Sequence, residues 1–581
     1  MSALMMFVRS DRFLAVLAGL VTVAVLTTVA FTGWIPQDEG TLGQAAVRVL
    51  RGEMPHVDFK DGYPGLQAVF HAGFFALLEP SIRTLRMAWL MVAGVAAAAF
   101  FLLVRRWAAK SVSILVGIGA VVAGFVFYPA SMPAWWNVMF AALSLVLVMK
   151  GSEEDSARYM TAAGLVSGLN VLIRTTGLFV VIPSFLWLFA RRPSRNRWSL
   201  EIASIVALIA ISVLNFPGAS LSRLILIWLP ASASIVWIWM GRVPAGPSPS
   251  IRDTGRFMPW IYLGMACVPA LIVVTVYAGL GELAGLVEGW VVSPSLRLGV
   301  GTVDVPIFLP SLILLGGLVA AEKLFGRMFG SRVYSVVLAL AIGLWGFAGW
   351  PTFRTSVIAV SLWLPAVLIS FGLYRSLRGQ TNDETALFGS VAAMFAMVQI
   401  PFWSGVYTAY VIPLLVVGAV YIFRHQVSVI SIAVGCVSVV LLAQSSAHRM
   451  VGSFVAAEPI PLVVLESPRG GIRIPEAHDY YNQLYVRVGE VSGDSGIYAG
   501  PDAPEVAYLA GVSSANKNAW EALDPNWDPS IVVDLAERGV PVAINLEPGF
   551  SPRLPESDLR KIYDFLPHFE RFGAIELRWS E

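Results

Sequence analysis

Long apolar stretches dominate the first 445 of the 581 residues of this chain. A membrane-spanning helix needs about 20 mainly apolar residues, because the bilayer core holds no water to satisfy its backbone. The pattern predicts about fifteen spans, some of them short. We place them at residues 13–34, 87–104, 111–128, 137–149, 158–173, 175–190, 202–217, 221–241, 257–278, 305–321, 333–350, 355–374, 385–402, 406–423 and 427–444.

Residues 65–78 form an apolar stretch that does not fit as a crossing. It is about 14 residues long, below the usual length of a span. We interpret it as an interfacial or re-entrant helix at the outer surface. The alternative is a short tilted span, which would invert the topology of everything that follows.

The basic residues set the predicted topology. Lys and Arg in short loops collect on the cytoplasmic side of a membrane. With a cytoplasmic N-terminus, every second loop carries the basic residues, which are Arg105, Arg106, Lys110, Lys150, Arg191, Arg192, Arg195, Arg197, Arg242, Arg252, Arg256, Lys323, Arg327, Arg332, Arg375, Arg378 and Arg424. This places residues 34–86, 129–136, 279–304, 350–354 and everything after about 445 outside.

The last part of the chain has a different composition. Residues 1–444 hold 29 Lys+Arg and 18 Asp+Glu, whereas 445–581 hold 11 and 20, so a net charge of +11 is followed by one of −9. We therefore predict a multi-span transmembrane domain over 1–445 and an extracytoplasmic domain over 446–581.

The predicted fold of the second domain is a small α/β layer. Its apolar and polar positions predict helices at 475–491, 531–538 and 556–565, and strands at 496–499, 506–509, 540–546 and 575–579. No phosphate-binding Gly-rich motif occurs in it. The simplest interpretation is an accessory or acceptor-recognition domain.

Composition narrows the class of protein. Hydrophobic residues make up 57% and charged residues 13%, about half the roughly 25% of charged residues in soluble domains. The net charge of +2 excludes a polyelectrolyte, and we expect no nucleic-acid partner. Two cysteines in apolar runs do not indicate disulfides.

Acidic residues are the clearest chemical signal in the membrane part. Five of its 18 acids lie within residues 38–61 of the first outer loop (35–86), and the same loop carries His56, Lys60 and Tyr63; the five acids are Asp38, Glu39, Glu53, Asp58 and Asp61. Carboxylates at the border of lipid are more basic than in water, which suits a general base. A lone acid there would more simply keep the loop hydrated, but this mixture is typical of a binding loop.

Three cations on the predicted outer side could bind an anionic group. Lys60 lies in the first loop, Arg174 lies between two apolar runs, and Arg297 lies in a later outer loop. An Arg at membrane depth is costly enough to indicate function. For Arg297 a solvated loop cation remains an equal alternative.

The order of these features resembles the GT-C superfamily of integral-membrane glycosyltransferases. The matching features are Asp38-Glu39 at the outer end of the first span, an amphipathic stretch at 41–51, the segment 52–59 (Gly-x-x-Pro-x-x-Asp-Phe), and Tyr63-Pro64 before an interfacial helix. Protein-mannosyltransferase and aminoarabinose-transferase-like proteins are the most similar branch. The resemblance is strongest over residues 30–190.

The resemblance implies a transferase that passes a sugar from a polyprenyl-phosphate donor to an acceptor hydroxyl, with inversion. Asp38 would be the base, with Glu39 beside it for positioning or tuning. Arg174 matches by position a cation of relatives. His56, Asp58, Lys60, Tyr63, Arg174 and Arg297 are the candidate substrate-binding residues.

The chain also departs from that family. Gly65 stands where relatives commonly have a second Pro, and residues 128–137 contain no acid. His56 and Asp58 alone do not define a metal site. We therefore predict no certain cofactor and leave a divalent cation open.

Location and partners follow from the same likeness. We expect a multi-pass protein of the plasma (inner) membrane that contacts membrane lipid, a polyprenyl-phosphate-linked sugar, and a glycan, lipid or protein acceptor. The alternatives are a multi-span transporter or lipid-linked-sugar flippase, and a structural envelope protein. A transporter would carry ionisable groups or broken helices at the midplane of its spans.

Overall fold

The computed structural model describes residues 10–191, 257–293, 383–399, 405–423, 461–493, 496–517, 527–548 and 551–580, with a few isolated positions between them. The predicted spans at 305–321, 333–350, 355–374 and 427–444 lie outside the described residues, as do nearly all of 202–217 and 221–241.

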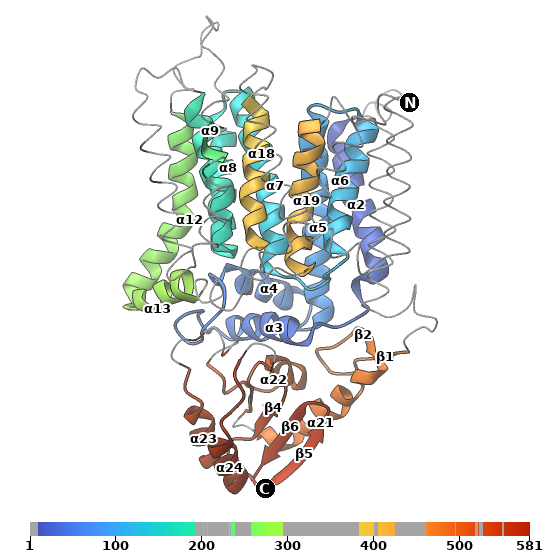
Figure 1. Ribbon diagram of the computed structural model, residues 1–581, viewed down its shortest axis with the longest axis vertical. Helices are drawn as coiled ribbons and strands as arrows, with labels where there is room; N and C mark the ends of the chain where they lie inside the picture. The colour runs from blue at the N-terminus through green and yellow to red at the C-terminus, as the bar shows by residue number, and fades with distance from the viewer. Residues whose placement is uncertain are drawn as a thin grey trace, which may run out of the picture.

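Apolar helices make up most of the described membrane part (Figure 1). They are α2 (Asp11–Ala30), α5 (Ile82–Arg105), α6 (Lys110–Phe125), α7 (Pro133–Glu153), α8 (Ala157–Ile173), α9 (Leu178–Ala190), α12 (Met258–Leu280), α18 (Asp383–Ala396) and α19 (Gly405–Phe423). Among the described residues, α2, α5, α7 and α12 are each long and apolar enough to cross a membrane. The chain is thus a polytopic α-helical membrane protein, as predicted.

Basic loops meet at one end of this bundle, the upper end in Figure 1. Arg105 Nε lies 3.1 Å from Asp11 Oδ1, and Arg106 pairs with Glu153 and, at 3.2 Å, with Glu384. The opposite end carries the two short helices α3 and α4 and the C-terminal residues. This separation agrees with the alternation of basic loops, while the assignment of that end to the cytoplasm stays a prediction.

Small residues let the helices pack closely. A Cβ atom on Gly19 of α2 would lie 2.7 Å from the carbonyl oxygen of Gly94 in α5, and one on Gly124 of α6 would lie 2.6 Å from that of Ala409 in α19. Glycines at such crossings allow backbones to approach, which is the main source of helix association in lipid.

Two helices, α3 (Pro36–Leu50) and α4 (Leu66–Leu77), lie across the end of the bundle and not along its spans (Figure 1). Pro36 occupies the first turn of α3, where its missing N–H costs nothing. Gly65, at φ 100°, turns the chain into α4. The placement of α4 is that expected of an interfacial helix.

The C-terminal residues form a small mixed sheet with helices. The elements are β1 (Leu462–Val464), β2 (Arg473–Pro475), α21 (Tyr480–Ser492), β3 (Tyr498–Gly500), α22 (Pro504–Ala510), α23 (Ser530–Glu537), β4 (Val542–Asn545), α24 (Glu556–Phe565), β5 (His568–Phe572) and β6 (Ile575–Trp579). The four-stranded sheet has the order β3-β4-β6-β5, with β3 parallel to β4 and the other pairs antiparallel.

One sequence prediction in this region was wrong, and strands β1, β2 and β5 were missed. Residues 506–509, predicted as a strand, belong to helix α22, which begins at Pro504 and ends at Gly511 in the left-handed conformation. Burial of almost every residue of α22 removed the polar positions that reveal a helical period. Strand β5 was missed because four of its five residues are exposed, so it lacks an apolar face.

The C-terminal part is closely attached to the membrane part. Helix α22 packs on α3, where a Cβ on Gly43 would lie 2.6 Å from Cε2 of Tyr508. Backbone hydrogen bonds join Arg473 N to Phe31 O (2.9 Å) and Ile82 N to Arg469 O (2.8 Å). Apolar side chains of both parts belong to one continuous core.

Replacing Gly43 with Ala should loosen this attachment. The added methyl group has no space against the Tyr508 ring, and overpacking of this kind costs about 1–3 kcal/mol. We expect a lower thermal midpoint in detergent and faster trypsin cleavage of the C-terminal part. The control is Gly73→Ala on the exposed face of α4, where a Cβ meets nothing within 4 Å. Equal midpoints and cleavage rates in the two variants would contradict the close packing.

Candidate active site

The candidate site begins where the first span ends. Helix α2 ends at Ala30, and a short turn leads into α3, so Asp38 and Glu39 both lie in the first turn of α3. Unpaired backbone N–H groups and the helix dipole favour negative charge at this position.

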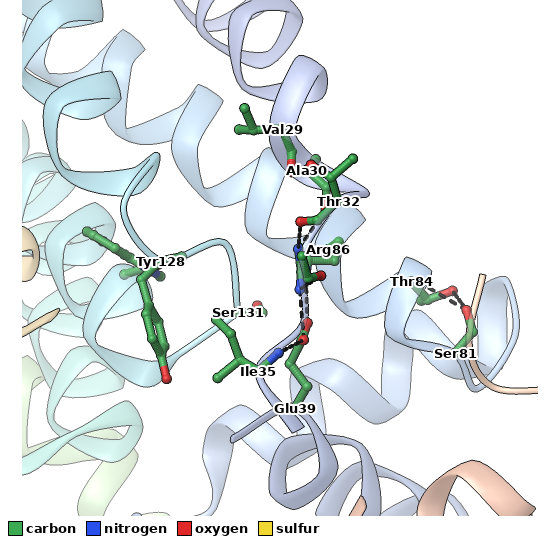
Figure 2. Close-up of polar contacts among 12 residues, drawn as sticks. Val29, Ala30, Thr32, Ile35, Glu39, Ser81, Thr84, Arg86, Tyr128 and Ser131 are labelled. Carbon is green, nitrogen blue, oxygen red and sulfur yellow. Dashed lines mark hydrogen bonds and ion pairs between the residues drawn. The ribbon is translucent and has the colours of Figure 1, made fainter. Parts of the chain in front are cut away.

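Glu39 is completely buried in an ion pair with Arg86 of α5 (Figure 2). Both oxygens of Glu39 accept hydrogen bonds from the guanidinium, one of them at 2.7 Å from Nη2. Glu39 Oε2 also accepts from Ile35 N at 3.1 Å. Arg86 further donates to the carbonyl oxygens of Ala30 (2.9 Å) and Gly33 (3.2 Å), which closes the end of α2.

This arrangement leaves Glu39 no access to a substrate, because neither side chain of the pair is exposed. Its contacts tie the end of α2, the start of α3 and the start of α5 to one another. The geometry therefore favours the positioning role that the resemblance implied for Glu39.

Asp38 points away from that pair and accepts a hydrogen bond from the phenol of Tyr128, in the loop between α6 and α7. Asp38 is half-buried. The edge of Tyr128 meets the ring of Tyr410 of α19, with centroids 6.2 Å apart. Tyr410 interacts electrostatically with Asp38, Tyr63 and Arg174. Three sequence-predicted residues, Asp38, Tyr63 and Arg174, are thus brought together around Tyr410.

Arg174 lies at a break between α8 and the 3₁₀ turn Thr175–Gly177, with an extended backbone. Its guanidinium carbon lies 5.9 Å from the centroid of the Tyr407 ring. Within the described ranges, no hydrogen bond or ion pair of the guanidinium is present. A half-buried cation beside an aromatic face can bind an anion.

Buried amides hold the break in place. Asn137 of α7 donates to Asn170 Oδ1 at 2.7 Å and accepts from Thr176 Oγ1 at 3.2 Å. Both Asn side chains are fully buried. The position of Arg174 is therefore set by polar contacts inside the bundle.

His56 contacts the backbone of Tyr63. It is buried, its Nε2–H donates to the carbonyl oxygen of Tyr63 at 2.9 Å, and its ring packs on Gly289. Burial lowers the pKa of His56 to about 4, against the opposing effects of the Tyr63 hydrogen bond and the charge of Glu288. At neutral pH His56 is an uncharged structural residue that shapes the loop.

Asp58 and Lys60 also form hydrogen bonds or ion pairs with other groups of the protein. Asp58 Oδ2 accepts from Met54 N at 2.7 Å and closes a turn. Lys60 Nζ lies 2.8 Å from both Glu288 and Asp524, which links the loop to the helical segment 283–292 that follows α12 and to the C-terminal part. Burial lowers the pKa of Lys60, but the hydrogen bonds and charges of those two carboxylates outweigh it, so the net shift is upward. Arg297 lies outside the described residues.

Sequence reasoning missed Arg86, Tyr128, Tyr407 and Tyr410. Arg86 could have been found, because a charged residue in the first turns of an apolar span requires a buried partner. The three tyrosines carry no such signal. Nothing in the sequence reveals which tyrosine of a distant segment reaches Asp38.

Metal ligands do not gather here: within the described ranges, no group of three or more His, Cys, Asp or Glu side chains is placed to hold a metal ion.

Buried carboxyl groups support α3 from the opposite side. The backbone of Glu505 in α22 packs on Gly40, and Glu505 Oε1 accepts from Tyr481 at 3.1 Å. Glu521 accepts from Tyr498 (3.2 Å) and from the backbone of Asp502 (2.9 Å). Burial raises the pKa of Glu505 and of Glu521 to about 7 in each case.

Breaking the Glu39–Arg86 pair should destabilise the protein strongly. Glu39→Gln leaves Arg86 charged and buried without a counter-ion. This should lower the free energy of unfolding by roughly 3–5 kcal/mol. The double variant Glu39→Met, Arg86→Met removes both charges and should lose less than Glu39→Gln alone. Thermal unfolding in detergent measures both; a double variant as unstable as the single one would contradict this account.

Glu505 should make stability depend on pH. Its pKa is higher in the folded protein, about 7, than the ordinary 4.5 of the unfolded chain. The folded state therefore binds the proton more tightly, and stability falls as the pH rises from about 4.5 to 7. In Glu505→Gln the fall in unfolding free energy with pH should be smaller by on the order of 2 kcal/mol. The measurement is the thermal midpoint of both proteins from pH 5 to 8. An unchanged slope would refute the assignment.

Comparisons with known proteins give distant structural likenesses only. No family model and no curated protein matches the chain. The crystal structure of the Archaeoglobus fulgidus oligosaccharyltransferase in complex with Zn and sulfate matches with 13% identity and a TM-score of 0.42 over 87% of this chain, which spans 62% of that protein.

Two crystal structures of ArnT from Cupriavidus metallidurans are also similar. The structure bound to undecaprenyl phosphate has 14% sequence identity to this chain, and the apo structure has 13%. Each match has a TM-score of 0.37 and covers 97% of this chain. The matches cover 98% of the bound ArnT chain and 97% of the apo ArnT chain. Likenesses this distant assign no substrate or activity to this chain.

Proposed function

We propose that the chain is a membrane glycosyltransferase that moves a sugar from a polyprenyl-phosphate donor to an acceptor hydroxyl at the outer face of the plasma membrane. One observation carries the proposal. A carboxylate (Asp38), an available cation (Arg174) and three tyrosines (Tyr63, Tyr128 and Tyr410) gather at one end of an apolar bundle. Helices α3 and α4 border that end, where a lipid phosphate meets water.

The proposed reaction follows from these groups. Asp38 takes the proton of the acceptor hydroxyl as the oxygen attacks the anomeric carbon. The bond between that carbon and the phosphate oxygen breaks, and the phosphate leaves with the electron pair. Arg174 would stabilise the departing phosphate, and attack from the opposite face inverts the anomeric centre.

The tyrosines and the first loop have supporting roles in this proposal. Tyr407 and Tyr410 lie one turn apart on α19. The half-buried Tyr407 has an aromatic face suited to a sugar ring, and the buried Tyr410 packs against it. Tyr63 borders the same cluster. The contacts of His56, Asp58 and Lys60 support a role in holding the loop, and Arg297 stays a candidate for the donor phosphate. The acceptor could be a glycan, a lipid or a protein.

The position of charges favours an enzyme over a transporter. In the described spans, every charged side chain lies within about five residues of a helix end. Transporters place ionisable groups near the midplane of their helices. Flux of a solute or lipid through purified proteoliposomes without an acceptor would reverse this choice.

Asp38→Asn should abolish transfer while the protein still folds, since the amide oxygen can accept the Tyr128 hydrogen bond. Loss of the base predicts a fall of about 10²-fold or more in turnover. The assay is release of undecaprenyl phosphate from a panel of undecaprenyl-phosphate monosaccharides, with membranes of the source organism supplying the acceptor. Asp534→Asn, on exposed α23, is the matched control. Turnover near that of the unmodified protein in Asp38→Asn would contradict the proposal.

A further inference from the structure

The loop that carries Tyr128 is anchored at both of its ends. Trp135, in the first turn of α7, donates from Nε1 to the carbonyl oxygen of Tyr128 at 3.0 Å. The Trp135 ring is fully buried, stacks on Phe125 with centroids 4.1 Å apart, and meets Tyr410 edge-on at 4.7 Å. These contacts fix the backbone of Tyr128.

Helix α4 holds the middle of the same loop through contacts with Ser131. Gln67 donates from its amide to the Ser131 carbonyl oxygen, and His71 Nε2 lies 3.0 Å from Ser131 Oγ. Trp136 Nε1 donates to the same hydroxyl at 3.2 Å. All four residues are buried, so the loop has little freedom to move.

The phenol of Tyr128 acts as a hydrogen-bond donor. Burial raises the pKa of Tyr128 well above its usual value, and the negative charge of Asp38 adds to the effect. The group therefore stays protonated throughout the physiological range, with the Asp38 carboxylate as its acceptor. A hydrogen bond to the charged form of a carboxylate holds its orientation and favours the ionised state.

We propose that Tyr128 is the positioning residue of the reaction, a phenol held by Trp135 and α4 that orients the Asp38 carboxylate toward the acceptor hydroxyl. This inference rests on the proposed function for its catalytic meaning. Tyr128 lies in residues 128–137, which contain no acid, so its phenol would serve the base from a loop without a second carboxylate.

Other groups around Asp38 come from each neighbouring element. Tyr410 lies on α19, Arg174 acts on Tyr410 from the break after α8, and Glu39 on α3 is neutralised by Arg86 of α5. Glu505 packs behind α3 at Gly40. The hydrogen bond from Tyr128 to Asp38 can be removed by deleting one oxygen atom.

The test measures the proton affinity of Asp38 and the activity separately. Infrared titration of the purified protein in detergent follows the carboxyl band that is lost in Asp38→Asn. Tyr128→Phe should raise the pKa of Asp38 by about one unit or more, because a hydrogen bond to the ionised form is removed. The control is Tyr485→Phe, a half-buried tyrosine of α21.

Activity on the undecaprenyl-phosphate monosaccharide panel gives the second measurement. In Tyr128→Phe the acid limb of the kcat/KM profile should move upward by the same amount, and kcat at the optimum should fall at least 10-fold. Trp135→Phe, which frees the Tyr128 backbone, should produce the same shift to a smaller extent. Tyr485→Phe should leave both the profile and the thermal midpoint in place.

The outcomes separate the inference from the proposed function. An unmoved carboxyl band in Tyr128→Phe overturns the inference even if the enzyme is active. Tyr128→Phe could instead lose rate equally at every pH, with an unmoved acid limb of the kcat/KM profile and a lower thermal midpoint. That result would assign Tyr128 a purely structural role and would also overturn the inference. A shifted band in a protein that turns over no donor supports the contact and contradicts the proposed function instead.

Discussion

The buried ion pair between Glu39 and Arg86 is the constraint on which the candidate site depends. It joins the end of α2 and the start of α3, which follow each other along the chain, to the distant start of α5. Removing two charges from water is costly, and the cost is offset here by bidentate geometry and by carbonyl oxygens that take the remaining donors. Because Asp38 is adjacent to Glu39 in the first turn of α3, this pair also determines where the proposed base lies.

Helix α3 uses its different faces for different partners. Asp38 is directed to the loop between α6 and α7, whereas Gly40 and Gly43 lie against α22 of the C-terminal part. The catalytic helix of the proposal is therefore enclosed between the bundle and the C-terminal sheet. This favours a supporting role for residues 446–581 in addition to the recognition role expected from the sequence, and the boundary at 445 stays a prediction.

Long-range contacts limited what could be predicted from the sequence. The described spans lie close to their predicted ranges, because about 20 apolar residues can satisfy their backbone in lipid only as a helix. Asp38, Tyr63 and Arg174 were selected from charge at membrane depth and from the family resemblance, and their roles in a site stay predictions. The strand predicted at 506–509 failed because burial on all sides hides the helical period. The pairing of Tyr128 with Asp38, 90 residues apart, depends on packing that no local pattern encodes.

The central claim is that Asp38 and Arg174 face one site that receives a prenyl-chain phosphate. A cryo-electron microscopy structure of the protein saturated with undecaprenyl phosphate tests it most directly. The account predicts the phosphate within hydrogen-bonding distance of the Arg174 guanidinium, with the Asp38 carboxylate, still bonded to Tyr128, facing the same space. A phosphate bound elsewhere, with Asp38 turned into bulk water and Arg174 paired with another protein group, would contradict it.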